Sequence, residues 1–452
     1  MLTAAEMAAV DARAAATVPF AELVRRAGTA AAGSALRLLG GAYGRRVVVV
    51  AGKGHNGDDG RVVASLLARR GAAVTVVPAG AAVRLPVADL VVDAAYGTAF
   101  HGDYRAPDAG AGTPVLAVDL PSGVRADTGA AVAGAVRAVR TVTFGALKPG
   151  LLLGEGRLLA GLVELAPIGL PVGPAAINLV GDDDLSGLPP RRPDGHKWDA
   201  ACFVVAGSPG MAGAAALAAR GALRAGSGMV RLGSPGAAPG AVPVLEAVAT
   251  ALPADGFADA VLAGLGRCKA LVVGPGLGRG AAVAPAVRRL LAEADVPLVL
   301  DADALNALGR LADHADVLAR RRAPVVVTPH EGEFARLAGA APGADRVGDV
   351  RRLAAASGAH VLLKGPTTVV AAPGGDVLLA SAGTARLATA GTGDVLSGIV
   401  GAFLARGLGP LQAAALAAHV HGRAAELGLA EGLVSGDLPD LVATFLSGAA
   451  GA

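Results

Sequence analysis

Residues 390–398 read Ala-Gly-Thr-Gly-Asp-Val-Leu-Ser-Gly, and this stretch decides the fold of the second half of the chain. Gly391 and Gly393 leave backbone amides free to approach an anion, and the apolar residues that follow predict a helix over 392–406. Asp394 falls in the first turn of that helix, where a carboxylate could take a proton from a hydroxyl beside a phosphoryl group. Alternatively, the acidic residue only complements the helix dipole.

Strands and helices alternate outward from this motif through both halves of the chain. Short apolar, β-branched runs predict buried strands at 47–51, 73–77, 89–93, 115–119, 139–144, 202–206, 270–273, 297–301, 325–327, 360–363 and 367–370. Helical patterns predict two helices within 4–40 and others at 61–70, 212–225, 281–293, 331–338, 392–406 and 410–427. This alternation predicts an α/β protein with mostly parallel sheets and, in the first half, Rossmann-like winding.

The length of 452 residues predicts two domains. Six prolines fall within residues 166–195 among glycines and aspartates, so the domain junction is expected there. We place the first domain at 1–175, the junction at 176–195 and the second domain at 196–452.

Composition excludes several classes of protein. Hydrophobic residues make up 53% of the chain and no apolar run approaches the roughly 20 residues of a membrane span, so no membrane partner is expected. The net charge of +3 is dispersed and aromatic residues are 3%, which argues against a nucleic-acid partner. Without a signal-peptide pattern the chain is expected in the cytoplasm. Cys202 and Cys268 are expected to be buried free thiols.

Lysine and asparagine are scarce in this arginine-rich chain, which has 40 lysines and arginines together. Because arginine could serve most surface positions, a retained lysine or asparagine is more often one with a specific role. The lysines are at 53, 148, 197, 269 and 364, and the asparagines are at 56, 178 and 306.

In the first half, polar residues follow several predicted strands, and open α/β sheets bind ligands at these strand ends. The loop 52–60 is glycine-rich, Asp93 precedes the segment 97–103, and Asp119 begins Asp-Leu-Pro-Ser-Gly. Lys148 lies in a further loop, 143–150. Asp93 and Asp119 could instead cap helices or turns. Asn56, Asp93 and Ser122 offer oxygen ligands of the kind that a hard cation takes.

These motifs resemble the NAD(P)H-hydrate epimerase (YjeF N-terminal) family, a Rossmann-like three-layer fold whose members interconvert the R and S epimers of hydrated NADH and NADPH. The resemblance implies that Asp119 contacts the nicotinamide end and is the candidate for proton transfer. It implies potassium on Asn56, Asp93 and Ser122. It implies that the hydrate is held by His55, Asn56, Gly57, Asp58, Asp59, Gly97, Thr98, Ala99, Phe100, His101, Gly102 and Asp103. His55 and Asp58 stand where the family usually has Asn and Gly.

The motifs of the second half resemble the ADP-dependent NAD(P)H-hydrate dehydratase family, which has a ribokinase-like α/β fold. The motifs are Val204–Ser208, Val273–Gly278, Asp301–Asn306, Thr328–Leu337, Lys364–Thr368 and Ala390–Gly398. The resemblance implies that ADP phosphorylates the C6 hydroxyl of the S-hydrate, that phosphate then leaves, and that AMP remains. Asp394 would be the base, and Gly278, His330 and Asp394 would contact the hydrate. The ADP site would contain Lys364, Gly365, Pro366, Thr367, Thr368, Gly391, Thr392 and Gly393.

The same resemblance implies magnesium, with Glu333 holding a metal-bound water, and ADP as co-substrate. His330 could instead be a capping or core histidine. The expected substrates are NADHX, NADPHX and ADP, and we expect a homo-oligomer, a tetramer or larger.

One alternative is a ribokinase-like kinase of a vitamin precursor, fused to a non-catalytic Rossmann-like domain that binds a ligand or acts as a scaffold. ATP-dependent phosphorylation of a vitamin precursor would favour it.

Overall fold

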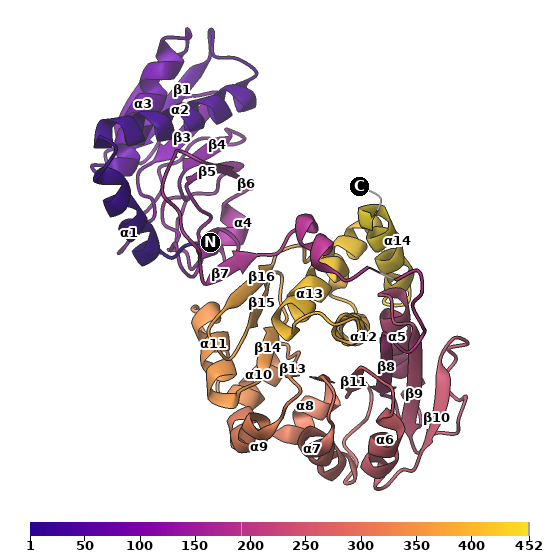
Figure 1. Cartoon of the computed structure of the whole chain (residues 1–452). Helices are drawn as coiled ribbons and strands as arrows, with labels where there is room; N and C mark the ends of the chain where they lie inside the picture. The colour runs from indigo at the N-terminus through magenta and orange to yellow at the C-terminus, as the bar shows by residue number, and fades with distance from the viewer. Residues whose placement is uncertain (191, 451–452) are drawn as a thin grey trace. The chain divides into compact units, whose positions relative to one another are not determined.

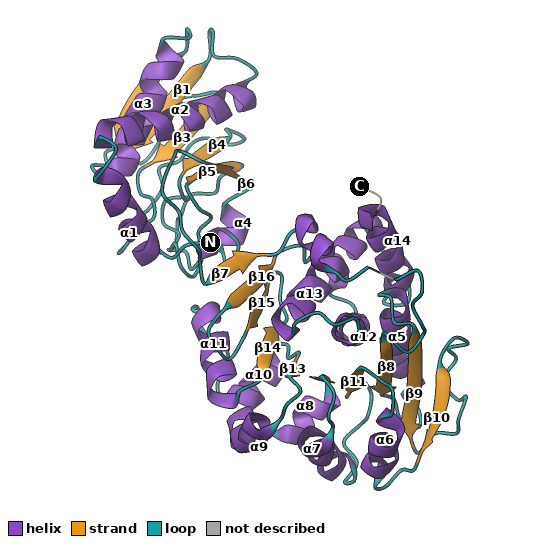
Figure 2. Cartoon of the chain, viewed as in Figure 1, coloured by secondary structure: helices purple, strands orange, loops and turns teal. Residues whose placement is uncertain are grey.

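The computed structural model describes residues 1–190 and 192–450, which divide into two units, Met1–Ala176 and Ile177–Ala452. Each unit has its own sheet, flanked by helices (Figures 1 and 2). The predicted α/β class is therefore confirmed. Within the described residues, no helix combines the length and apolar character needed to cross a bilayer.

The sheet of the first unit has six parallel strands in the order β2-β1-β3-β4-β5-β6. The chain starts at β1, goes to one side for the edge strand β2 and returns to the other side of β1 for β3. Ligand sites form beside such reversals, at the carboxyl ends of the strands. The strands are β1 (Arg46–Ala51), β2 (Ala73–Pro78), β3 (Leu90–Ala94), β4 (Val115–Val118), β5 (Arg140–Phe144) and β6 (Leu162–Ala166).

Two helices, α2 (Phe20–Leu39) and α3 (His55–Ala68), cover one face of this sheet. Alanines of α2 pack there against alternate valines of the strands, such as Val47 and Val49. The other face, which includes Val48 and Val50, is covered by loop residues such as Leu85 and Phe100. The third layer of the first unit is therefore built from loops. The remaining helices are α1 (Ala4–Ala15), α4 (Gly156–Leu159) and the 3-10 turn Pro149–Leu151.

The second unit contains a ten-stranded sheet in the order β10-β9-β8-β11-β12-β13-β14-β15-β16-β7. Only the β14–β15 and β15–β16 pairs are antiparallel. The strands are β7 (Ile177–Leu179), β8 (Ala201–Val205), β9 (Met229–Pro235), β10 (Val248–Leu252), β11 (Ala270–Val273), β12 (Leu298–Leu300), β13 (Val325–Val327), β14 (His360–Leu363), β15 (Thr368–Ala371) and β16 (Val377–Ala380). Of these, β7, β9, β10 and β16 were not predicted, nor was β6 of the first unit.

Helices cover both faces of the second sheet (Figure 1). One group shares a large apolar core: α5 (Ala212–Arg224), α12 (Thr392–Ala405), α13 (Pro410–Leu427) and α14 (Leu438–Ala450). The other helices are α6 (Phe257–Leu265), α7 (Val283–Glu293), α8 (Asp303–Leu308), α9 (Ala315–Arg320), α10 (Glu331–Ala338), α11 (Arg346–Ser357) and the 3-10 helices Asp182–Gly187, Leu311–His314 and Ala385–Leu387.

The close packing of α5 on α12 depends on glycine. A Cβ on Gly398 would lie 2.0 Å from the carbonyl oxygen of Ala218, and one on Gly221 would lie 2.5 Å from that of Val395. The two helix backbones therefore touch, which fixes where α12 begins.

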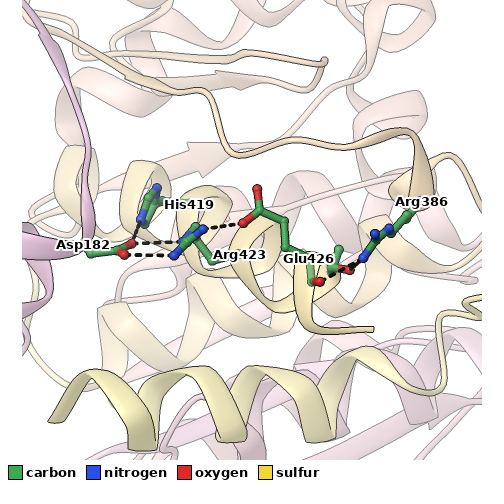
Figure 3. Close-up of polar contacts among 6 residues, drawn as sticks. Asp182, Arg386, His419, Arg423 and Glu426 are labelled. Atoms are coloured by element: carbon green, nitrogen blue, oxygen red, sulfur yellow. Dashed lines mark hydrogen bonds and ion pairs between the residues drawn. The ribbon is translucent and has the colours of Figure 1, made fainter. Parts of the chain in front are cut away.

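The stretch from Ile177 onward, which we predicted as part of the junction, lies in the second unit. Its strand β7 pairs in parallel with β16. Asp182 then accepts hydrogen bonds from two residues of α13, at 2.7 Å from Nε2 of His419 and 3.1 Å from Nη2 of Arg423 (Figure 3). Sequence reading missed these contacts because the partners of Asp182 are 237 and 241 residues away along the chain.

Candidate active sites at the strand ends

In the first unit, the strand-end carboxylate of Asp119 is held by four hydrogen bonds. Thr98 donates from its backbone nitrogen at 2.9 Å and from its hydroxyl at 2.5 Å, and Thr143 donates from its hydroxyl at 3.2 Å. Lys148 Nζ donates at 2.7 Å. The backbone of Asp119 has φ 68°, a conformation that is uncommon outside glycine and found often at functional sites.

Lys148 is the buried partner of this carboxylate, with a side chain only 1% exposed. Its ammonium also donates to the Thr143 hydroxyl and to the carbonyl oxygen of Phe144. Burial by itself would raise the pKa of Asp119, but Lys148 and Thr98 outweigh burial and hold that pKa below its ordinary value. Asp119 is therefore ionised at neutral pH.

Asn56 and Gly97 lie beside Asp119. A Cβ on Gly97 would be 2.8 Å from Asp119 Oδ2 and 3.4 Å from Asn56 Oδ1, so glycine keeps this space open. The side-chain amide of Asn56 is buried and has no hydrogen-bond partner among the residues that the structure describes. An unsatisfied buried amide points to a bound ligand or ion, because leaving it unpaired is costly.

Asp93 and Ser122 form a buried pair near these residues. Ser122 donates to the Asp93 carboxylate from its backbone nitrogen at 2.8 Å and its hydroxyl at 2.7 Å. Burial raises the pKa of Asp93 to about 6. With the unpaired oxygen of Asn56, the pair offers an all-oxygen donor set of the kind that fits a hard cation.

The other residues of the first unit that were predicted to contact the hydrate differ from one another in their exposure and in their neighbours. Asp58 lies in the first turn of α3 and pairs with Arg61 at 2.9 Å, so aspartate is accommodated where the family usually has glycine. The ring of His55 contacts that of Phe20 at 4.4 Å between centroids. Phe100 is buried in the core of the loop-covered face, whereas His101 and Asp103 are exposed.

Asp59 is buried, with 8% of its surface exposed. Its pKa is raised, whereas that of Asp119 is lowered. Burial first, and then the negative charges of Asp119, Asp58 and Asp11, raise the pKa of Asp59 to about 8. At neutral pH Asp59 is therefore protonated, whereas Asp119 is ionised. Opposed pKa shifts of this kind are typical of acid–base pairs.

We expect Asp59→Asn to stabilise the protein at neutral and higher pH. The pKa of Asp59 in the folded protein, about 8, lies above the ordinary aspartate pKa of 3.8. The unfolded chain therefore releases a proton between these values, and stability falls as pH rises through this window. Asparagine removes that loss, on the order of 2–4 kcal/mol at pH 8 and little at pH 4. Urea unfolding at both pH values measures it, with the exposed Asp103→Asn as control. Equal gains at both values would contradict the assignment.

In the second unit, the predicted anion-binding loop starts helix α12. Gly391 is in the left-handed conformation with φ 91°, and a Cβ there would meet Leu217 at 2.6 Å and Ser435 at 2.7 Å. Thr392 donates from its hydroxyl to the carbonyl oxygens of Leu387 and Thr389, which fixes the loop.

The segment before this loop is anchored by Arg386. Its guanidinium donates to the carbonyl oxygens of Ala425, Glu426 and Gly428 at the end of α13. Figure 3 shows Arg386 beside Glu426. Carbonyl groups at a helix C-terminus have few partners within the helix, so these bonds satisfy the end of α13 and fix it to Arg386. The anion-binding loop is thus attached to both α12 and α13.

Lys364 and Asp394 meet at the start of α12. A Cβ on Gly393 would lie 3.2 Å from Lys364 Nζ, so the ammonium is beside the glycine loop. Lys364 also pairs with the buried Asp301 at 2.8 Å. Burial first, and then Asp301, raise the pKa of Asp394 to about 7, while Lys364 acts to lower it. Asp394 is therefore close to half ionised at neutral pH, which suits a general base.

His330 caps helix α10. Its Nδ1 accepts from the backbone nitrogens of Gly332 and Glu333, and the Glu333 carboxylate accepts from the backbone nitrogen of His330 at 2.9 Å. The capping alternative for His330 is thus observed, yet its ring is 58% exposed and free to touch a ligand. Gly278 donates its backbone hydrogen to Asp303 at 2.8 Å.

The remaining residues of the predicted nucleotide site form the turn between β14 and β15. Gly365 and Pro366 lie in the turn, while Thr367 and Thr368 are buried at 4% and 8% exposure. The turn follows Lys364 directly, so it lies next to the glycine loop that Lys364 contacts.

Comparisons with known proteins fit this arrangement. Residues 202–447 match the family described as NAD(P)H-hydrate dehydratase, and residues 20–86 and 80–150 match that described as YjeF-related protein N-terminus. The chain is 42% identical over 432 residues to the bifunctional NAD(P)H-hydrate repair enzyme Nnr of Mycobacterium tuberculosis (strain CDC 1551 / Oshkosh), covering 88% of each chain. The chain belongs to the family of bifunctional NAD(P)H-hydrate repair enzymes. The Moorella thermoacetica member is 36% identical, over 98% of this chain and 96% of its own.

A solved structure of this repair family confirms the ribokinase-like fold of the second unit. It is the ADP/ATP-dependent NAD(P)H-hydrate dehydratase from Bacillus subtilis, co-crystallised with ATP/Mg2+. Its sequence is 31% identical, the TM-score is 0.51, and the match covers 60% of this chain and 98% of that one.

Sequence reading assigned no role to several residues that the structure of this repair-family member places at the sites. Lys148, Asp301 and Asp303 all lie within the motifs described above. Each of them binds another group of the protein, and no local sequence pattern identifies such a contact. The scarcity of lysine was a usable signal, since Lys148 and Lys364 are both ion-paired to strand-end carboxylates.

Proposed function

We propose that this protein repairs hydrated nicotinamide nucleotides in two steps. The first unit would interconvert the R and S forms of NADHX and NADPHX, and the second would dehydrate the S form with ADP. The observation that carries the proposal is Asp394 at the start of α12, with Lys364 and the glycine loop beside it.

In the second unit, Asp394 would take the proton of the C6 hydroxyl as that oxygen attacks the terminal phosphorus of ADP. The bond between that phosphorus and the bridging oxygen of AMP breaks. Phosphate then leaves C6 with the electron pair of the C–O bond while C5 loses a proton, so that the C5–C6 double bond re-forms. Backbone amides of Gly391, Thr392 and Gly393 and the ammonium of Lys364 would balance the phosphoryl charge. Lys364 suits this role because Asp301, Glu333 and Asp394 together outweigh burial and raise its pKa.

The nucleotide and the hydrate would be held by the surrounding loops. Gly365, Pro366, Thr367 and Thr368 would line the ADP site, and Gly278 and the exposed ring of His330 would contact the hydrate. The relative from Bacillus subtilis was crystallised with ATP/Mg2+, which supports nucleotide and magnesium use here.

Magnesium would screen the phosphate charges. Among the described residues, no three acidic, histidine or cysteine side chains converge as a direct ligand set. The residues instead fit an ion held through water and the nucleotide phosphates, which is how Mg2+ is commonly bound. Glu333, 5% exposed, would hold one such water.

In the first unit, Asp119 would accept and return a proton at the C6 carbinol while Asp59, protonated at neutral pH, would be the complementary acid. Residues 55–59, at the start of α3, and residues of the loop 97–103 would hold the hydrate. The buried and unpaired amide of Asn56, with Asp93 and Ser122, fits a potassium ion, which would balance the charge of this pocket.

The test uses mixed R and S hydrates of NADPH with ADP, ATP or no nucleotide. We expect nucleotide-dependent recovery of reduced-nicotinamide absorbance from both epimers. Recovery from one epimer alone would leave only the dehydratase, and no recovery would reject the proposal. The vitamin-precursor kinase is not favoured, because the similarity to repair enzymes extends over both units.

Two further expectations accompany this function. A cytoplasmic location would place the protein with the nicotinamide cofactors that it repairs, and a homo-oligomer is expected. Size-exclusion chromatography with light scattering would measure the assembly.

A further inference from the structure

Two aspartates at the end of β12 are directed to two different partners. Asp301 is 1% exposed and pairs with Lys364, which is 63 residues away in the sequence. Asp303 accepts from the backbone nitrogen of Gly278, 25 residues away. Between them Ala302 has φ 50° and ψ −118°, a conformation that is strained for any residue with a side chain. Strain of this kind persists where the surrounding structure imposes it and is common at functional sites.

Asp301 determines where the Lys364 ammonium lies. The Asp301 carboxylate is 2.8 Å from Lys364 Nζ, and the same ammonium would lie 3.2 Å from a Cβ on Gly393. A partly buried ammonium without a counter-charge either loses its proton or turns toward solvent, because burying an unpaired charge is costly. Asp301 therefore keeps Lys364 both charged and next to the glycine loop.

The loop 274–278 is fixed by the same strand end. A Cβ on Gly274 would lie 1.8 Å from the carbonyl oxygen of Asp301, so the two backbones are in contact. At the other end of the loop, the Asp303 carboxylate holds the Gly278 amide, where φ is 75°. Ser208 donates from its hydroxyl to the carbonyl oxygen of Gly276 and completes the support.

We propose that Asp301 and Asp303 are positioning residues with divided roles, Asp301 for the nucleotide through Lys364 and Asp303 for the hydrate through Gly278. Neither would touch a substrate. The short turn at Ala302 would then couple the placement of the two binding groups. This inference rests on the proposed function of the second unit.

The nucleotide arm compares ADP binding by calorimetry, with magnesium, for the full chain and its Asp301→Asn variant. We expect the ADP Kd to rise about tenfold or more and the hydrate KM to change less than about twofold. The Lys364→Met variant tests whether Asp301 acts on ADP through Lys364. If it does, adding Asp301→Asn to Lys364→Met should weaken ADP binding no further. A further loss in the double variant would overturn the role of Lys364 as intermediary.

The hydrate arm uses two substitutions at Asp303. Asp303→Ala removes the acceptor for Gly278, so the hydrate KM should rise about tenfold while the ADP Kd stays within about twofold. Asp303→Asn keeps an acceptor oxygen and should restore most of the loss, which a purely structural role of the charge would not allow. The exposed Asp313→Asn is the matched control.

The outcomes separate this inference from the function on which it rests. If the unsubstituted protein binds no ADP and restores no hydrate, the proposed function fails. If that protein is active but Asp301→Asn and Asp303→Ala change both constants equally, only the division of roles is overturned.

Discussion

Asp394→Asn should reduce ADP-dependent dehydration of the S-hydrate by between about a hundredfold and ten-thousandfold, the usual contribution of a general base. Asparagine preserves the shape of the side chain and the helix start, so the loss would come from the missing proton acceptor. Coupled recovery of reduced nicotinamide, with S-hydrate and ADP saturating, measures it. ADP binding should persist, because the substitution removes a negative charge near the phosphates.

The pH dependence gives a second test of Asp394. Its pKa of about 7 means that kcat/KM should fall as pH drops below about 7, because the base becomes protonated there. The residual kcat/KM of Asp394→Asn should not show this fall below pH 7. Asp376→Asn, an exposed aspartate of the same unit, is the control and should keep both rate and profile. A fully active Asp394→Asn would contradict the proposed base.

Asp119→Asn should reduce consumption of the R-hydrate to the spontaneous rate of epimer exchange, while the S-hydrate is still dehydrated at the original rate. Asparagine tolerates the positive φ at this position. The assay follows the recovery of reduced-nicotinamide absorbance from an R/S mixture. The S-hydrate is recovered in a first phase, and the R-hydrate in a slower second phase that requires epimerisation. Asp108→Asn, exposed in the same unit, serves as control and should keep both phases.

Loss of folding is the main alternative explanation for a defect in Asp119→Asn, because Lys148 would stay buried without its counter-charge. Breaking a buried pair from one side typically costs about 3–5 kcal/mol. The double variant Asp119→Asn/Lys148→Met removes both charges and should recover much of that stability without recovering activity. If the double variant regained activity, Asp119 would not be the proton-transfer group.

The sequence predicted the central strands and the candidate carboxylates Asp119 and Asp394, because the residues around each of them form a local pattern. A short β-branched run such as Val47–Ala51 is typical of a buried strand, and the glycine-containing loop at 390–393 precedes an apolar helix. Strand β9 was missed because it contains Arg231, Gly233 and Pro235, which interrupt the apolar pattern. Gly233 is nevertheless required, since a Cβ there would lie 2.5 Å from Leu252.

The supporting residues of the sites could not be predicted in the same way. The contacts of Asp301 with Lys364 and of Asp119 with Lys148 span 63 and 29 residues, and nothing in either local sequence specifies the partner. Likewise, the covering of one face of the first sheet by loops depends on where residues such as Leu85 and Val136 pack. Contacts between residues far apart in the sequence determine these features. The local periodicity of apolar residues gives no information about such contacts.

The pairing of β7 with β16 determines where the chain can be cut. A truncated protein starting at residue 196 would leave β16 as an open sheet edge, with His419 and Arg423 deprived of Asp182. Open edges of this kind recruit strands from other molecules and lead to aggregation. An isolated C-terminal fragment should therefore begin at or before Ile177 to remain monodisperse.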